Sequence, residues 1–165
     1  MSIFLCKVLA PTVALGLLLS GCGGGSDDPE PTPIGASLTV SAATNATLNG
    51  VYSTNTVALA EVEKINPIGG DPEVCSFRFS GLAKPGGGLM DGDIRYIPGT
   101  NELRVIFVSI SGLEFVSRDP TNAGVDRANN EIDLTGKLMT ASTGVASTIT
   151  LTGSMPMRGN RPEGC

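Results

Sequence analysis

Hydrophobic and polar residues alternate along much of the chain after residue 34. Between residues 147 and 155, Ile149, Leu151 and Met155 fall on one side, and threonine or serine residues fall on the other. A period of two is typical of a β-strand with one buried face. Because no window keeps the three-to-four-residue spacing of an amphipathic helix, we expect an all-β fold.

A second alternating run, at residues 131–139, precedes this one and is joined to it by a turn at 140–146. The pattern predicts an antiparallel hairpin. If the alternation continues unbroken, Leu134 and Leu138 lie on the buried face and Lys137 lies on the solvent face.

Other short runs predict strands at 37–42, 48–53, 56–64, 75–81, 93–98 and 102–110. The run from Val105 to Val108 is apolar on both faces, which indicates a strand covered on both sides. In total we expect about seven to nine short strands separated by Gly, Pro, Asn or Asp, a pattern typical of an antiparallel β-sandwich or a small β-barrel. Two longer loops are expected at 66–73 and 117–130, and long loops on a rigid sheet often carry function.

The first residues have a different character. Lys7 precedes an apolar run from Val8 to Leu19, which at about 12 residues is too short to span a bilayer. It has the length of a signal-peptide core. The residues that follow, Leu19-Ser20-Gly21-Cys22, resemble the lipobox of bacterial lipoproteins. The resemblance implies a signal peptide at 1–21, cleavage before Cys22, thioether diacylation of Cys22 and acylation of its new amino group.

The resemblance also suggests a location. In the enterobacterial sorting pattern of this family, Asp after the lipidated cysteine retains a lipoprotein in the inner membrane, whereas this chain has Gly23. We therefore expect a lipid-anchored protein of the cell envelope, in the outer membrane and facing the periplasm or the cell surface. Residues 22–33 are rich in Gly, Pro and acidic residues and are predicted to form a disordered tether. Residues 34–165 are predicted to form a single domain.

The two remaining cysteines, Cys75 and Cys165, are predicted to form a disulfide, since secreted proteins fold in an oxidising compartment. The bridge would also hold the polar C-terminal segment against the domain. Two thiols without histidine partners make a poor metal site.

Charge and composition exclude several functions. The chain has a net charge of −5, and removal of Lys7 with the signal peptide makes it −6. An acidic domain of this kind argues against nucleic acid or an anionic lipid surface as a partner. Histidine and tryptophan are both missing, which rules out Ser-His-Asp and Cys-His catalysis and histidine-based metal sites. We expect no catalytic residue, no metal site and no cofactor.

Two groups of carboxylates are candidate sites. Asp91 and Asp93 would share one face of a strand and could perform acid–base chemistry or bind Ca²⁺, although Asp-Gly-Asp more often forms a turn. The stretch 118–133 is rich in Asp and Asn, but Ala123 and Asn130 break the EF-hand spacing.

Taken together, these observations predict an envelope lipoprotein that carries a non-catalytic binding or accessory β domain. Its partners would be the membrane, through the lipid on Cys22, and an envelope protein or a small ligand. Two alternatives remain at this point. One is a lipocalin-like carrier of a small apolar ligand, with strands such as 105–108 lining its cavity, and the other is a hydrolase that uses only carboxylates such as Asp91 and Asp93.

Overall fold

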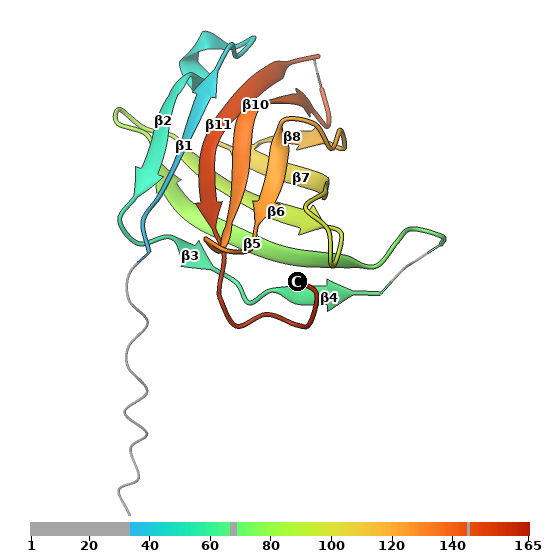
Figure 1. Ribbon diagram of the computed structural model, residues 1–165. Helices are drawn as coiled ribbons and strands as arrows, with labels where there is room; N and C mark the ends of the chain where they lie inside the picture. The colour runs from blue at the N-terminus through green and yellow to red at the C-terminus, as the bar shows by residue number, and fades with distance from the viewer. Residues whose placement is uncertain (1–33, 67–68, 145) are drawn as a thin grey trace, which may run out of the picture. The chain divides into compact units, whose positions relative to one another are not determined.

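Strands 36–41 to 148–156 close into an antiparallel β-barrel in the computed structural model, which describes residues 34–66, 69–144 and 146–165 (Figure 1). The all-β prediction is confirmed, and of the two predicted architectures the barrel is the one formed. Eight strands make up the barrel: β1 (Ala36–Ser41), β2 (Gly50–Thr54), β5 (Val74–Ala83), β6 (Leu89–Tyr96), β7 (Leu103–Ile110), β8 (Leu113–Ser117), β10 (Glu131–Ala141) and β11 (Thr148–Pro156). A 3₁₀ turn, η1 (Ala46–Leu48), lies between β1 and β2.

The barrel closes through pairings between distant parts of the chain. The strand order is β11-β1-β2-β5-β6-β7-β8-β10, and β10 pairs back with β11 through the predicted hairpin. The first strand, β1, lies between β2 and β11, with Leu38 opposite Tyr52 on one side and Gly153 on the other. Closure gives every barrel strand a neighbour on both sides, which removes exposed sheet edges.

One edge of β5 is covered by three segments in turn. The strand β2 meets β5 only at Ser53 and Ala83, after which β3 (Ala58–Leu59) and β4 (Glu63–Ile65) continue along the same edge. Figure 1 shows β3 and β4 running below β5. The predicted strand 56–64 is therefore two short strands, because this segment has one more residue than β5 between the two pairings.

The predicted loop 117–130 contains an additional strand, β9 (Ala123–Asp126), and β8 precedes it. Both pair with the same edge of β10, β8 at Thr140–Ala141 and β9 at Glu131–Leu134. The sequence pattern missed β8 because its inward side carries Ser117 as well as Phe115, so its alternation of polarity is weak.

The inner face of the barrel is a single hydrophobic cluster. Large side chains from all eight strands are almost fully buried in it: Leu38, Tyr52, Phe77, Phe79, Met90, Ile94, Tyr96, Ile106, Val108, Phe115, Leu134, Met139, Ile149 and Leu151. An eight-stranded barrel is just wide enough for its own side chains to fill it. The predicted facing of Ile149, Leu151 and Met155 is confirmed, since all three are buried.

The predicted facing of Lys137 and Leu138 is wrong. Lys137 is 1% exposed and Leu138 is 58% exposed. The register between β10 and β11 shifts between Thr135 and Lys137, and Gly136 adopts a φ of 71°. This bulge inserts one residue into β10, so every side chain beyond it points to the opposite face.

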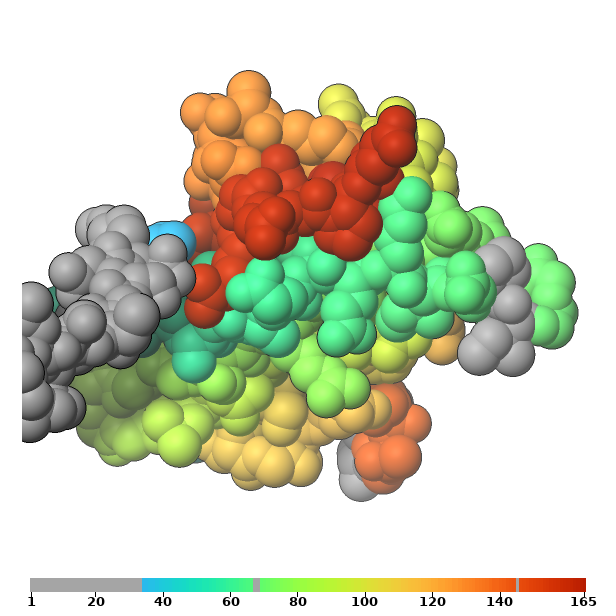
Figure 2. Space-filling model, turned by 90° about the horizontal axis from the view of Figure 1, so that it is seen from below, coloured from blue at the N-terminus to red at the C-terminus, as the bar shows by residue number. Residues whose placement is uncertain are grey.

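The C-terminal segment is joined to the start of β5. The sulfur atoms of Cys75 and Cys165 lie 2.10 Å apart in the predicted disulfide. The Tyr96 hydroxyl donates a hydrogen bond to the backbone oxygen of Cys165 (3.0 Å), and Arg158 Nε donates to the Leu59 backbone oxygen (3.1 Å). Figure 2 shows this segment lying across β3 and β4.

Residues 1–33, with the predicted signal peptide, Cys22 and tether, lie outside the described residues. Within the described part of the chain, no helix is long and apolar enough to cross a membrane.

Candidate functional site

The outer face of β5, β6 and β7 carries two rows of side chains set by the strand register. In one row Arg78 lies opposite Asp93, which lies opposite Phe107. In the next row Arg95 lies opposite Val105. This wall of the barrel, rather than its interior, therefore presents charged groups beside an aromatic ring.

The end of β8 adds another arginine to the second row. The last paired residue of β8 is Ser117, opposite Ile106. Arg118 follows directly and therefore lies next to Val105 on the outer face. Val105 thus lies between Arg95 on β6 and Arg118 at the end of β8.

A bulge in β7 brings in a third arginine. Arg95 pairs with Val105 and Tyr96 pairs with Leu103, so Arg104 is an extra residue between them. Bulges often redirect a side chain at the edge of a site. Here Arg104 and Val105, although adjacent in sequence, both line the same surface cleft.

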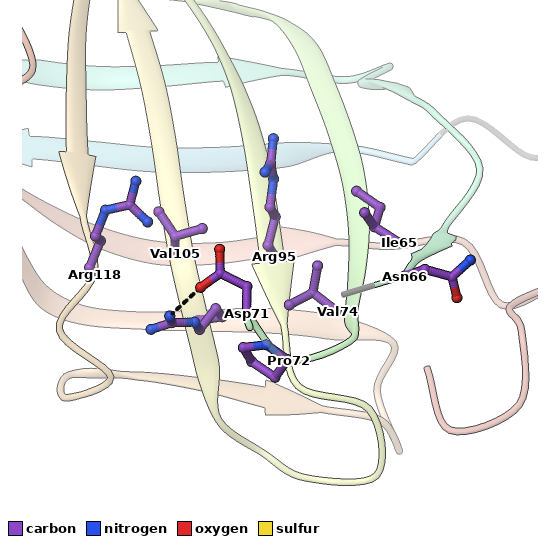
Figure 3. Close-up of a pocket in the computed structure, with 9 residues that line it drawn as sticks. Ile65, Asn66, Asp71, Pro72, Val74, Arg95, Val105 and Arg118 are labelled. Carbon is purple, nitrogen blue, oxygen red and sulfur yellow. Dashed lines mark hydrogen bonds and ion pairs between the residues drawn. The ribbon is translucent and has the colours of Figure 1, made fainter. Parts of the chain in front are cut away.

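This cleft has a volume of about 120 Å³ and is open to solvent. Asn66, Asp71 and Pro72, from the predicted loop 66–73, line one side of it, and residues of β4 to β7 together with Arg118 line the rest (Figure 3). Half of its lining is apolar, from Ile65, Pro72, Val74 and Val105, and the other half is polar, from Asn66, Asp71, Arg95, Arg104 and Arg118. Val105 is only 3% exposed, so the predicted cover on both sides is confirmed there, whereas Phe107 on the same outer face is only half-buried.

Arg95 is held by a carboxylate. Its Nε and one terminal nitrogen donate to the two oxygens of Asp93 at 3.2 and 3.0 Å. Asp93 also accepts a hydrogen bond from the Ser76 hydroxyl (3.1 Å) and lies 3.8 Å from Arg78 Nε. Donating these hydrogen bonds to Asp93 holds the pKa of the Arg95 guanidinium above its ordinary value.

Arg104 has a weaker partner. One of its terminal nitrogens lies 3.3 Å from Asp71 Oδ1, and the Asp71 side chain is 75% exposed. Figure 3 shows the Asp71 side chain between Val105 and Pro72, and its Oδ1 accepts the hydrogen bond from Arg104. Exposed ion pairs of this kind contribute only about 0–1 kcal/mol, so the contact is easily exchanged.

Arg118 is oriented by an aromatic ring instead. Its Cζ lies 5.9 Å from the centre of the Phe107 ring, and Arg95 Cζ lies 5.4 Å from the same centre. Among the described residues, Arg118 makes no hydrogen bond or ion pair. A cation–π contact positions a guanidinium without neutralising its charge.

The resulting site is electropositive. Its lining contains three arginines and one carboxylate, whereas the whole chain has a net charge of −5. A guanidinium offers parallel N–H donors that match a carboxylate or phosphate. The arrangement is therefore suited to binding an anion.

The carboxylates considered from the sequence have structural partners. Asp91 and Asp93 do share the outer face of β6, on a strand rather than in a turn. Asp91 accepts a hydrogen bond from the Gly81 backbone N–H (3.3 Å), and Asp93 is bound to Arg95. Both carboxylates therefore take part in hydrogen bonds of the barrel wall.

The stretch 118–133 brings three carboxylates together. Asp126, Glu131 and Asp133 each place one oxygen within 4.8 Å of the others. Asp126 accepts hydrogen bonds from the Asn129 backbone and side chain, which lower the pKa of its carboxyl group. Asp133 accepts from the Ser154 hydroxyl at 2.7 Å. Two of the three carboxylates thus have hydrogen-bond partners within the protein.

The arginines of the cleft were not singled out in the sequence. Arg95 and Arg104 lie on neighbouring strands, Arg118 follows a strand that the pattern missed, and no short motif contains all three. The one available signal was that Arg78 and these three make up four of the ten basic residues after Lys7. Only the strand register brings them to one wall.

Comparisons of the chain with protein-family models, with curated proteins and with solved structures found no match.

Proposed function

We propose that this protein is a lipid-anchored binding module of a bacterial cell envelope, whose barrel binds a small anionic ligand on its outer wall without transforming it. Cys22 carries the acyl anchor, and residues 23–33 form the tether. The observation that supports binding most directly is the set of three arginines around one cleft in an otherwise acidic chain.

The anchor is proposed on the lipobox resemblance of Leu19-Ser20-Gly21-Cys22. Two or more acyl chains hold a protein stably on a membrane, whereas one does not. Gly23 favours the outer membrane over the inner membrane in the sorting pattern that the signal resembles.

A binding role fits the chemistry of the cleft better than a catalytic one. Arginine is protonated at all ordinary pH values and does not act as a general base. The cleft contains one carboxylate, Asp71, which is exposed and paired with Arg104. These groups can hold an anion, but they do not pair a nucleophile with a base.

An outer-wall site is also favoured over a lipocalin-like interior site. The buried rings of Phe77, Phe79 and Phe115 belong to the hydrophobic cluster of the barrel. An apolar ligand carried inside would have to displace these rings. The outer cleft is already open to solvent.

The binding proposal is tested on the full chain, expressed in a bacterium that processes lipoproteins and purified from membranes in a non-ionic detergent. Native mass spectrometry of the wild type should reveal a bound small anion. Arg118→Gln should lose it, because Arg118 supplies the unpaired positive charge. Arg78→Gln is the matched control, since Arg78 is 80% exposed on the same wall but does not line the cleft. Equal retention by all three proteins would contradict an arginine-dependent site.

The anchor is tested separately by cell fractionation. Cys22→Ser should move the protein out of the membrane fraction and remove the added mass of the acyl chains. A Cys22→Ser variant that stays membrane-bound would show that the attachment does not depend on this cysteine.

A further inference from the structure

We infer that the ligand of the arginine cleft is a small organic carboxylate with an apolar body, and that Asp71 occupies the carboxylate position when the ligand is absent. This inference rests on the proposed binding function and specifies its ligand class. It also assigns Asp71 the role of an internal competitor.

The position of Asp71 is the first argument. Asp71 lies on the loop between β4 and β5 and brings its carboxylate to Arg104 at 3.3 Å, at the cleft. The cleft therefore already accommodates one planar carboxylate beside a guanidinium. A ligand carboxylate can make the same contact with Arg104 in place of Asp71.

The cost of displacing Asp71 is low. Its side chain is 75% exposed, so its carboxylate is hydrated again as soon as it leaves Arg104. Gly69 and Gly70, immediately before it, adopt φ values of 64° and 93° with open space around them. Backbone in this left-handed region is freely accessible to glycine, and a Cβ at either position would meet no neighbour.

Arg118 supplies a positive charge that Asp71 does not pair with. The Phe107 ring orients its guanidinium, and no carboxylate among the described residues neutralises it. Arg95, by contrast, is committed to Asp93 through two hydrogen bonds. A ligand anion at this site therefore gains a charge-assisted contact with Arg118 that Asp71 does not make.

The apolar residues of the lining favour a ligand with a hydrocarbon part. Pro72 is exposed and Ile65 is half-buried, so these two present apolar surface to the cleft beside the guanidinium groups, whereas Val74 and Val105 are almost fully buried in its wall. Inorganic phosphate would leave this surface in contact with water. A carboxylate attached to a short hydrocarbon or an aromatic ring would cover it, and burial of apolar area is favourable.

The test uses benzoate as the probe and benzamide as its neutral match in shape. The isotope-labelled full chain in non-ionic detergent is titrated with each compound, and with inorganic phosphate, while amide chemical shifts are recorded. Benzoate should shift resonances around Val74, Val105 and Arg118 saturably, whereas benzamide and phosphate should bind at least tenfold more weakly. The benzoate affinity should also fall as salt is raised.

Two variants move the affinity in opposite directions. Arg118→Gln should weaken benzoate binding by roughly tenfold or more, the usual effect of losing a hydrogen bond between charged groups. Asp71→Asn should strengthen it by about two- to fivefold, because the competing exposed ion pair is worth up to about 1 kcal/mol. Arg78→Gln should change the affinity little.

Several results would overturn the inference. Benzamide or phosphate binding as well as benzoate would remove the carboxylate assignment, and so would no saturable benzoate binding. An unchanged or weaker affinity in Asp71→Asn would remove the competitor role. If Arg118→Gln still loses a co-purifying anion in that case, the proposed binding function stands and only the assignment of Asp71 fails.

Discussion

Lys137 provides the strongest test of how the barrel wall is held together. Its ammonium group is buried between β8 and β9, where the loop that joins these strands faces β10. It donates hydrogen bonds to the backbone oxygens of Asp119 and Thr121, the latter at 2.7 Å. Nearby, the Thr135 backbone N–H donates to the Asn122 backbone oxygen at 3.0 Å. Lys137 therefore replaces the ladder hydrogen bonds that β10 lacks between its pairings with β8 and β9.

We predict that Lys137→Met lowers the free energy of unfolding by about 2–4 kcal/mol. Two hydrogen bonds to a charged donor contribute about 1.5–3 kcal/mol each. Methionine removes both and leaves the carbonyls of Asp119 and Thr121 without that donor. It also removes the cost of burying an ammonium group, several kcal/mol, and its unbranched apolar side chain can fill the same space. Each of the two carbonyls left without a donor costs about 1–3 kcal/mol, and this cost sets the sign of the prediction.

The assay is urea unfolding of the full chain at neutral pH, followed by far-UV circular dichroism because the chain has no tryptophan. Lys64→Met is the matched control, since Lys64 is a partly exposed lysine paired with Glu73 at 3.6 Å. It should change stability by less than about 1 kcal/mol. The Thr135 amide should also exchange its hydrogen faster in Lys137→Met. A Lys137→Met protein as stable as Lys64→Met would refute the view that the ammonium group holds this part of the wall.

The same residue predicts a pH dependence. Burial lowers the pKa of Lys137, although the Asp119 carboxylate acts in the opposite direction. The unfolded chain, with a lysine pKa of about 10.4, therefore binds more protons than the folded chain just below that pH. Wild-type stability should gain from Lys137 deprotonation as the pH rises through this window. The stability difference between wild type and Lys137→Met should accordingly widen toward pH ~10.4, and a constant difference would contradict the lowered pKa.

Three further predictions concern other parts of the barrel. Cys165→Ser, or reduction of the Cys75–Cys165 bridge, should lower the free energy of unfolding by up to about 4–5 kcal/mol, the value that chain entropy gives for a loop of this size. Thermal melts with and without reductant measure this change, and identical melts would show that the bridge contributes nothing to stability. Gly92→Ala should destabilise the barrel by about 1–3 kcal/mol, because its Cβ would lie 2.5 Å from Phe79 Cζ; chemical unfolding that matches wild type would contradict this close packing. Burial raises the pKa of Tyr96, so the contribution of the neutral tyrosine to stability is complete below about pH 10 and is lost as the pH rises through the folded-state pKa. The Tyr96→Phe protein should therefore lose less stability than wild type when unfolding is measured at alkaline pH.

The sequence by itself determined the class of the fold and much of its local structure. The alternation of Ile149, Leu151 and Met155 with threonine and serine identified β11 and its buried face. Gly, Pro and Asn located most turns, because these residues favour turn conformations regardless of what packs around them. An even number of cysteines after Cys22 was enough to predict the Cys75–Cys165 bridge. All of these features depend on residues near one another in sequence or on a simple count.

The tertiary structure decided everything that depends on register between distant strands. Whether the sheet closes as a barrel is settled by the pairing of β1 with β11, and neither strand carries a local signal for that partner. The bulge at Gly136 reverses the faces of Lys137 and Leu138, because a period-two pattern shifts phase with a single extra residue. A second bulge, at Arg104, brings that arginine to the cleft. The cleft joins residues from β4 to β8, so it exists only once non-local pairing has fixed how each strand lies beside the next.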